Sequence, residues 1–198
     1  MNSRQLIIAV VLLFVASLGM GFYAWHMRKN AKANASATYA ASVTPPASGP
    51  TEQATLFVAD DSAGSLRTQQ ATISLPEDRQ ERAEELIRAL LNTYLEKNSP
   101  HIIAPGSDVR EVFLVDPGVA VIDMNSVFAD NHRSGILVED LTVASLVETL
   151  AQNLPGIQRV KILVNGKERD TLAGHADLSI FYDVSSINQM MSQMAASQ

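Results

Sequence analysis

Few side chains of this 198-residue sequence could perform acid–base chemistry, and Asp123 is the clearest of them. It follows a strongly apolar segment, and a carboxylate in such a place could serve as a general base. A carboxylate near a strand end also caps turns, and the backbone amides of residues 125–127 are its candidate donors. We interpret Asp123 as a turn-capping residue.

Three short acidic or histidine-containing patterns could contribute to a metal site. Asp130 with His132, and His175 with Asp177, each have the spacing of two ligands, and Asp60-Asp61 could hold a cation. Each pattern lacks a third and fourth ligand nearby, so solvated histidines and an ordinary acidic turn are the simpler interpretations. We expect no metal and no cofactor.

Motifs of known enzymes are absent from the sequence. It contains no Gly-x-Ser-x-Gly, no His-Glu-x-x-His and no phosphate-binding glycine loop. It also has no cysteine, which excludes disulfides, thiolate metal sites, a cysteine nucleophile and a lipid-modified cysteine. We predict a protein that is not an enzyme. A hydrolase with an unrecognised site around Asp123 is the least favoured alternative.

Charge also restricts the partners. The formal net charge is -6, and residues 54–183 hold 20 acidic against 11 basic side chains. Such a surface repels phosphate backbones, so we exclude nucleic acid. A basic island near the C-terminus is a candidate partner surface: Arg159, Lys161, Lys167 and Arg169. The alternative is a solvated hairpin whose charges pair, for example Lys161 with Asp170.

The N-terminal region is typical of a membrane anchor. Residues 6–27 contain no charged side chain and are long enough for a bilayer core of ~30 Å. Aromatic and then basic residues follow, as at a membrane interface. We predict an uncleaved signal-anchor over residues 1–29 with its transmembrane helix at about 6–27. A cleaved signal peptide is the alternative.

The remainder divides by composition into three parts. Residues 30–53 are rich in Ala, Ser, Thr and Pro, which predicts a disordered spacer. Residues 54–183 have the periodicity of a folded domain. Residues 184–198 predict a flexible or weakly helical tail, with apolar residues at helical spacing. That tail is either a frayed helix or a partner-binding helix.

Hydrophobic periodicity predicts the elements of the domain. We expect a strand hairpin over residues 54–59 and 66–75, and a second hairpin from Val109 to Phe128 around Pro117-Gly118. Helices are predicted at 79–96, capped by Asp78, and at 137–153. A strand at 157–164 leads through Asn165-Gly166 to a return strand, which we expect to be an edge strand or irregular because Lys167 and Arg169 would share a face with Ile162. The order β-β-α-β-β-α-β-β predicts an α+β sandwich, with two helices on one face of a mixed or antiparallel sheet.

Four segments in this order resemble the GerMN domain of sporulation, spore germination and other bacterial envelope proteins. They are Leu75-Pro-Glu-Asp-Arg79, residues 119–128, Val147-Glu-Thr-Leu150 and residues 160–168. The resemblance covers about residues 54–180. It identifies a set of signature positions: Asp123, Asn125, Phe128, Thr149, Leu150, Asn165 and Gly166. Asn125 stands where the family usually has serine, and both side chains can cap a turn.

The resemblance implies a non-enzymatic α+β fold similar to ring-building motifs. It also implies a single-pass protein of the cytoplasmic membrane with its domain on the extracytoplasmic side. There the domain would assemble with an envelope protein or with itself, in sporulation, germination or a general envelope role. Positive charge alone argues for the opposite orientation, because Arg28, Lys29 and Lys32 outnumber Arg4. A cell-wall or carbohydrate module that binds peptidoglycan is the alternative function, although the domain has few aromatic residues for stacking on sugars.

Overall fold

The fold described here is that of a computed structural model, which describes residues 50–115 and 117–196. The predicted anchor at 1–29 lies outside these residues, and so does the predicted spacer as far as residue 49. Within the described ranges, no helix is both long and apolar enough to cross a bilayer. The predicted spacer ended at residue 53, whereas the first strand already begins at Thr51.

The domain contains two sheets where we expected one. The first pairs β1 (Thr51–Asp60) with β2 (Ser65–Ser74) in an antiparallel hairpin. The second has the order β3-β4-β5-β6, formed by β3 (Val109–Val115), β4 (Val119–Met124), β5 (Arg159–Val164) and β6 (Tyr182–Asp183). This sheet is mixed, because β4 runs parallel to β5 and antiparallel to β3. β4 therefore lies inside this sheet, between β3 and β5.

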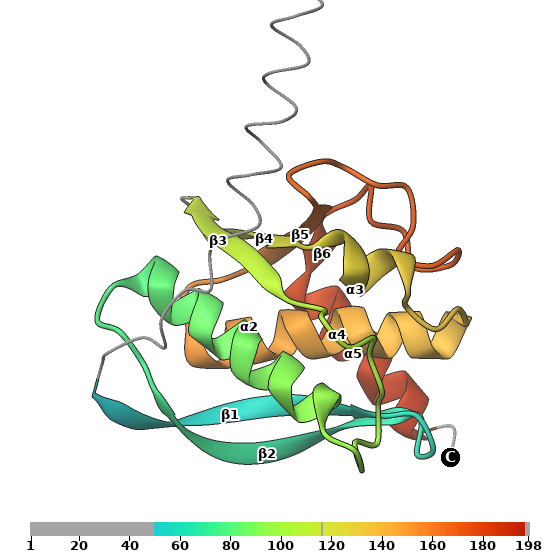
Figure 1. The fold of residues 1–198 in the computed structure, drawn as a ribbon, viewed down its shortest axis with the longest axis horizontal. Helices are drawn as coiled ribbons and strands as arrows, with labels where there is room; N and C mark the ends of the chain where they lie inside the picture. The colour runs from blue at the N-terminus through green and yellow to red at the C-terminus, as the bar shows by residue number, and fades with distance from the viewer. Residues whose placement is uncertain (1–49, 116, 197–198) are drawn as a thin grey trace, which may run out of the picture. The chain divides into compact units, whose positions relative to one another are not determined.

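Helices separate the two sheets. α2 (Arg79–Leu95) and α4 (Ile136–Asn153) lie between the four-stranded sheet and the β1–β2 hairpin (Figure 1). Every residue of α4 from Leu141 to Leu150 is buried. A helix buried on all sides is a core element rather than the cover of a single sheet. The predicted arrangement of two helices on one face of one sheet is therefore wrong in its layers, while the α+β class is confirmed.

The outer edge of β1 is bound by helix side chains, which explains why the two sheets do not join into one. The amides of Thr55, Phe57 and Ala59 donate to side chains of helices instead of to another strand. Their acceptors are Asn153 Oδ1 at 3.0 Å, Thr149 Oγ1 at 3.0 Å and the Tyr94 hydroxyl at 2.9 Å. Two residues of a strand advance ~6.6 Å and four residues of a helix ~6 Å, so Thr149 and Asn153 match alternate amides of β1.

The segment after Asn165-Gly166 is irregular, and the return strand that we expected there, as an edge strand or an irregular one, does not form a ladder. Asn165 (φ 52°) and Gly166 (φ 70°) do make the expected turn, but only an isolated bridge from Val164 to Lys167 follows. The partner of β5 is instead the two-residue β6, at Arg159 and Val160. Side chains hold residues 165–181 in place, as described below, so no regular ladder is needed there.

Two helices complete the fold beyond the predicted order. α3 (Ser126–Asp130) is a short helix directly after β4. α5 (Val184–Ala196) forms where a flexible or weakly helical tail was expected, and it packs against α4 and β2. Its Ile187 is 5% exposed and belongs to the main core.

Candidate functional site

The outer face of the four-stranded sheet is the surface on which the candidate residues meet. Ala120, Ile122 and Met124 of β4 are buried toward the helices, so the alternate residues of β4 face outward. We define the outer sheet face as Phe113, Val115, Val119, Val121, Arg159 and Lys161, which register pairing places in two adjacent rows across β3, β4 and β5. Phe113 is 38% exposed and Val115 is 51% exposed.

An aromatic residue extends this face beyond β5. The ring of Phe181 lies 5.4 Å from the guanidinium carbon of Arg159 and 5.6 Å from Lys161 Nζ. These are cation–π distances. Phe181 and its neighbour Ile180 are each 47% exposed. Apolar and aromatic side chains therefore surround the two cations.

The basic island is only partly available to a partner. Lys161 is 3% exposed, donates to the backbone oxygen of Ser179 at 2.6 Å and lies 3.3 Å from Glu168. Its predicted pairing with Asp170 is therefore wrong, because the return strand that would have placed Asp170 opposite it does not form. Arg169 pairs with Asp130 at 2.5 Å. Lys167 is exposed.

Arg159 is the cation on this face that a partner can reach. Its side chain is exposed, and within the described part of the chain no carboxylate lies at ion-pair distance from it. Its guanidinium lies over the Phe181 ring. A guanidinium on an apolar surface suits an incoming carboxylate, because it can donate two parallel hydrogen bonds.

Asp123 is committed to structure. Its Oδ1 accepts from the amide of Gly166 at 2.6 Å, and its Oδ2 accepts from Arg110 at 2.7 Å. The predicted donors at residues 125–127 were wrong, because the Gly166 amide, brought alongside by the parallel pairing of β4 and β5, donates to it instead. With both oxygens bound and 4% exposure, Asp123 lacks the free carboxylate that a general base requires.

The other signature positions also support the fold. Asn125 caps α3 by accepting from the Phe128 amide at 3.0 Å, which is the role expected of a serine there. Phe128 and Leu150 are core residues at 1% and 0% exposure. Thr149 binds the β1 edge.

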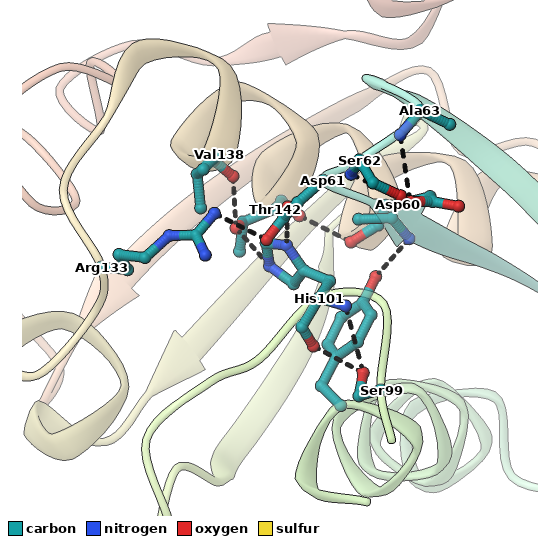
Figure 2. A network of polar contacts seen from close by, with 12 residues as sticks. Asp60, Asp61, Ser62, Ala63, Ser99, His101, Arg133, Val138 and Thr142 are labelled. Carbon is teal, nitrogen blue, oxygen red and sulfur yellow. Dashed lines mark hydrogen bonds and ion pairs between the residues drawn. The ribbon is translucent and has the colours of Figure 1, made fainter. Parts of the chain in front are cut away.

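A buried polar network contains the arrangement that most resembles a catalytic triad. His101 Nδ1 lies 2.7 Å from Asp61 Oδ1, and His101 Nε2 lies 2.9 Å from Thr142 Oγ1 (Figure 2). His132 Nε2 approaches the same hydroxyl at 2.9 Å, and Arg133 donates to Asp61 at 2.7 Å. Carboxylate, imidazole and hydroxyl are the groups of nucleophilic catalysis.

The burial of this network makes it a structural element. Thr142 is 0% exposed, and its hydroxyl is also within 2.8 Å of the Val138 carbonyl of its own helix. Burial lowers the pKa of His101, against the favourable effect of Asp61, and burial lowers the pKa of His132 as well. The network links the β1–β2 turn, the segment before β3 and the segment before α4. Nothing in the sequence spacing indicated it, because residues 61, 101 and 142 meet only in the fold.

The residue pairs that could have supplied metal ligands bind other groups in the structure. Asp130 binds Arg169, while His132 faces Thr142 and the Arg133 carbonyl. Asp177 accepts from the amide and hydroxyl of Ser179 in a local turn. Asp60 caps its own turn through Ser62 and Ala63. In the described ranges, no group of three or more potential ligand side chains is arranged to hold a metal.

Glu139 is a structural residue that sequence analysis missed. It is 0% exposed and accepts from His175 Nδ1 and from four backbone amides, those of Gly135, Ala173, His175 and Ala176, all at 2.9–3.0 Å. Burial raises the pKa of this carboxyl, but the hydrogen bonds outweigh it and lower the pKa to about 2. This one carboxylate fastens residues 173–176 to the start of α4.

The family of the chain follows from its match to a family model. The model described as "Germane: Sporulation and spore germination" matches residues 55–170, which run from β1 through the turn after β5. This chain belongs to the Germane family. The predicted GerMN-type domain is thereby confirmed. No curated protein matches the chain.

Solved structures similar to this Germane domain include three with high coverage of one chain or the other. A candidate lipoprotein from Clostridium perfringens shares 17% identity at a TM-score of 0.49, over 75% of this chain and 97% of that one. The tandem GerMN domains of the sporulation protein GerM from Bacillus subtilis share 20% identity with this chain at a TM-score of 0.49. The match covers 65% of this chain and 44% of that one. The first GerMN domain of GerM from Bacillus subtilis shares 20% identity with this chain at a TM-score of 0.47. The match covers 65% of this chain and 93% of that one. The family assignment rests on the family-model match.

Proposed function

We propose that this protein is a membrane-anchored, non-enzymatic assembly protein of the bacterial envelope. Its Germane domain would bind another envelope protein through the outer sheet face, on the extracytoplasmic side of the cytoplasmic membrane. The observation that carries this proposal is an exposed apolar sheet face around the reachable guanidinium of Arg159. The anchor is inferred from the uncharged segment at 6–27, and the sporulation or germination setting from the family description.

Exposed apolar patches on soluble domains commonly mark interaction surfaces. Arg and aromatic residues are enriched in protein–protein interfaces, and Phe113, Phe181 and Arg159 supply both types here. The partner that fits is a protein surface with apolar side chains around an Asp or Glu that reaches Arg159.

Binding through the face is favoured over addition of a strand to β3. The carboxylate of Glu84 on α2 accepts from the Val112 amide of β3 at 3.3 Å. A covered edge amide cannot pair with an added strand. For this sheet, the outer face is therefore the surface that we favour for association over the β3 edge.

The test is photo-crosslinking in intact cells from Val115, with an exposed β2 position, Gln69, as the control site. We expect an adduct from position 115 that disappears in the Phe113→Gln/Arg159→Glu variant, while Lys97→Glu leaves it intact. Lys161 is left unchanged because its burial would make charge reversal disrupt the fold. Loss of the adduct without a change in Tm supports the proposal, and an unchanged adduct contradicts it. An adduct of two identical chains would identify the partner as a second copy.

Binding to peptidoglycan is the second candidate function. The exposed rings of Phe113 and Phe181 could stack on sugars. Co-sedimentation with purified peptidoglycan separates the two candidates. Retention that depends on both rings would favour the cell wall, whereas a protein adduct without retention favours assembly.

A further inference from the structure

A buried carboxyl group lies beneath the C-terminal helix with an unsatisfied oxygen. Glu148 of α4 is 7% exposed, and its Oε1 is the one buried side-chain oxygen or nitrogen in the described residues without a hydrogen-bond partner. The carboxyl also contacts the side chain of Asn188 on α5, an exposed residue whose amide nitrogen donates to the Val184 carbonyl at 3.1 Å. A buried polar atom without a partner costs about 1–3 kcal/mol, so such an atom calls for an explanation.

The elements packed around Glu148 offer it no cation. α5 has no charged residue along its whole length. β2, on which α5 also packs, has one basic residue, Arg67, which pairs with Asp60 at 2.8 Å. α5 thus brings a neutral amide to a position where an ammonium or guanidinium group would make a charge-assisted bond.

α5 itself is held by few contacts. Ile187 is its one buried residue among positions 184–194, and Met190 and Met191 are partly buried against the core. A terminal element with few buried apolar side chains opens at low cost. Methionine-bearing surfaces also accommodate different apolar partners, because the side chain is flexible.

We propose that α5 covers a docking site for an amphipathic helix of a partner protein. That helix carries a Lys or Arg at the position of Asn188, pairs it with Glu148, and takes the place of α5 on α4 and β2. The proposal does not rest on the outer sheet face, which belongs to the other sheet. The two sites can therefore fail independently.

The first experiment places the missing cation on α5 itself. In the full-length protein, Asn188→Lys should raise Tm, and Glu148→Gln should abolish that gain. Gln189→Lys, on the next residue of α5, is the matched control and should give no gain, because both residues are exposed but Asn188 is the one that contacts Glu148. Equal Tm changes for the two lysine variants would overturn the assignment of Glu148 as a cation acceptor.

The second experiment tests displacement with defined probes. Two fluorescent peptides of residues 184–196, one unchanged and one with Asn188→Lys, are titrated against the wild-type full-length protein by anisotropy. We expect the lysine peptide to bind at least ~10-fold more tightly, which corresponds to ~1.4 kcal/mol. The preference should vanish with Glu148→Gln, and both peptides should bind more tightly to the Ile187→Ser variant, because loosening α5 lowers the cost of opening that they share. Equal affinities, or no binding of either peptide even to the Ile187→Ser variant, would overturn the proposal.

Discussion

Single carboxylates and hydroxyls carry much of the specificity of this fold. Glu139, Asp123 and Thr149 each satisfy backbone amides of segments far away in the sequence. A buried amide without an acceptor costs more than an average hydrogen bond contributes. These side chains therefore determine which loops and strand edges can be buried at all.

Glu139 should make the free energy of unfolding depend on pH in the acidic range. Its pKa is lowered from 4.5 to about 2 in the fold, so its contribution is complete above about pH 4.5 and is lost as pH falls toward 2. The difference corresponds to ~3 kcal/mol. In urea unfolding, Glu139→Gln should be clearly less stable than wild type at pH 7, and the gap should narrow by pH 3.

The exposed Glu77→Gln variant is the control and should follow wild type at both pH values. A gap between wild type and Glu139→Gln that stays constant from pH 7 to pH 3 would contradict the role of the ionised carboxylate.

Thr149 offers a test of the capped strand edge. Thr149→Val keeps the shape but leaves the Phe57 amide without its acceptor, which should lower the free energy of unfolding by about 1–3 kcal/mol. Amide exchange at Phe57 should accelerate. Thr149→Ser keeps the hydroxyl and should preserve slow exchange, although it loses one methyl group. Fast exchange in the serine variant, or slow exchange in the valine variant, would show that the hydroxyl is not the acceptor that matters.

At the scale of elements, the β3–β4 turn is held against the connection between α4 and β5. The carbonyl of Gly118 in the β3–β4 turn accepts from Gln158 at 2.7 Å and from Arg159 at 3.1 Å. This contact holds the turn against the α4–β5 connection, and it begins the parallel pairing of β4 with β5. The close approach depends on the absence of a side chain at Gly118.

Two glycines at this junction make a matched pair. A Cβ at Gly118 (φ 70°) would lie 2.6 Å from the Gly156 carbonyl oxygen, whereas a Cβ at Gly156 (φ 95°) would meet nothing within 4 Å. Gly156→Ala should cost roughly 1–2 kcal/mol through backbone strain. Gly118→Ala adds a backbone clash and should cost roughly 3–4 kcal/mol. Thermal unfolding of both variants checks this order, and equal losses would mean that the turn can move away.

At the scale of the molecule, both sheets share one core. The buried cluster includes Leu56 of β1, Leu90 of α2, Leu146 of α4 and Ile162 of β5. With α4 enclosed between the sheets, neither sheet keeps its apolar face covered without the helices. We therefore expect the two sheets to unfold together.

Hydrogen exchange at increasing urea tests this cooperativity. The amides of Phe57 in β1 and Ile162 in β5 should exchange with the same free energy, equal to that of global unfolding. Amides of α5 should exchange earlier, because few of its side chains are buried. A much lower free energy at Phe57 than at Ile162 would show that the β1–β2 hairpin detaches as a separate unit.

Local chemistry made several elements predictable. Asp78 caps α2 through the amides of Gln80 and Glu81, and Asn165-Gly166 forms a turn with positive φ at both residues. Hydrophobic periodicity located α2, α4 and the strands up to β5. The Asn165-Gly166 turn predicted a return strand that would be an edge strand or irregular, and no ladder forms there because the amides of Ala173, His175 and Ala176 donate to Glu139 instead. Glu139 and the Asp61–His101–Thr142 network were missed because their members are far apart in the sequence.

The sequence by itself determined the order of the strands up to β5 and of the helices α2 and α4, the acidic domain and the resemblance to GerMN domains, because these depend on neighbouring residues. Only the tertiary structure decided that α4 lies between two sheets, that Lys161 is buried while Arg159 is reachable, and that Glu148 lies unsatisfied under α5. Burial and hydrogen-bond satisfaction depend on which distant segments meet, and no local pattern encodes that.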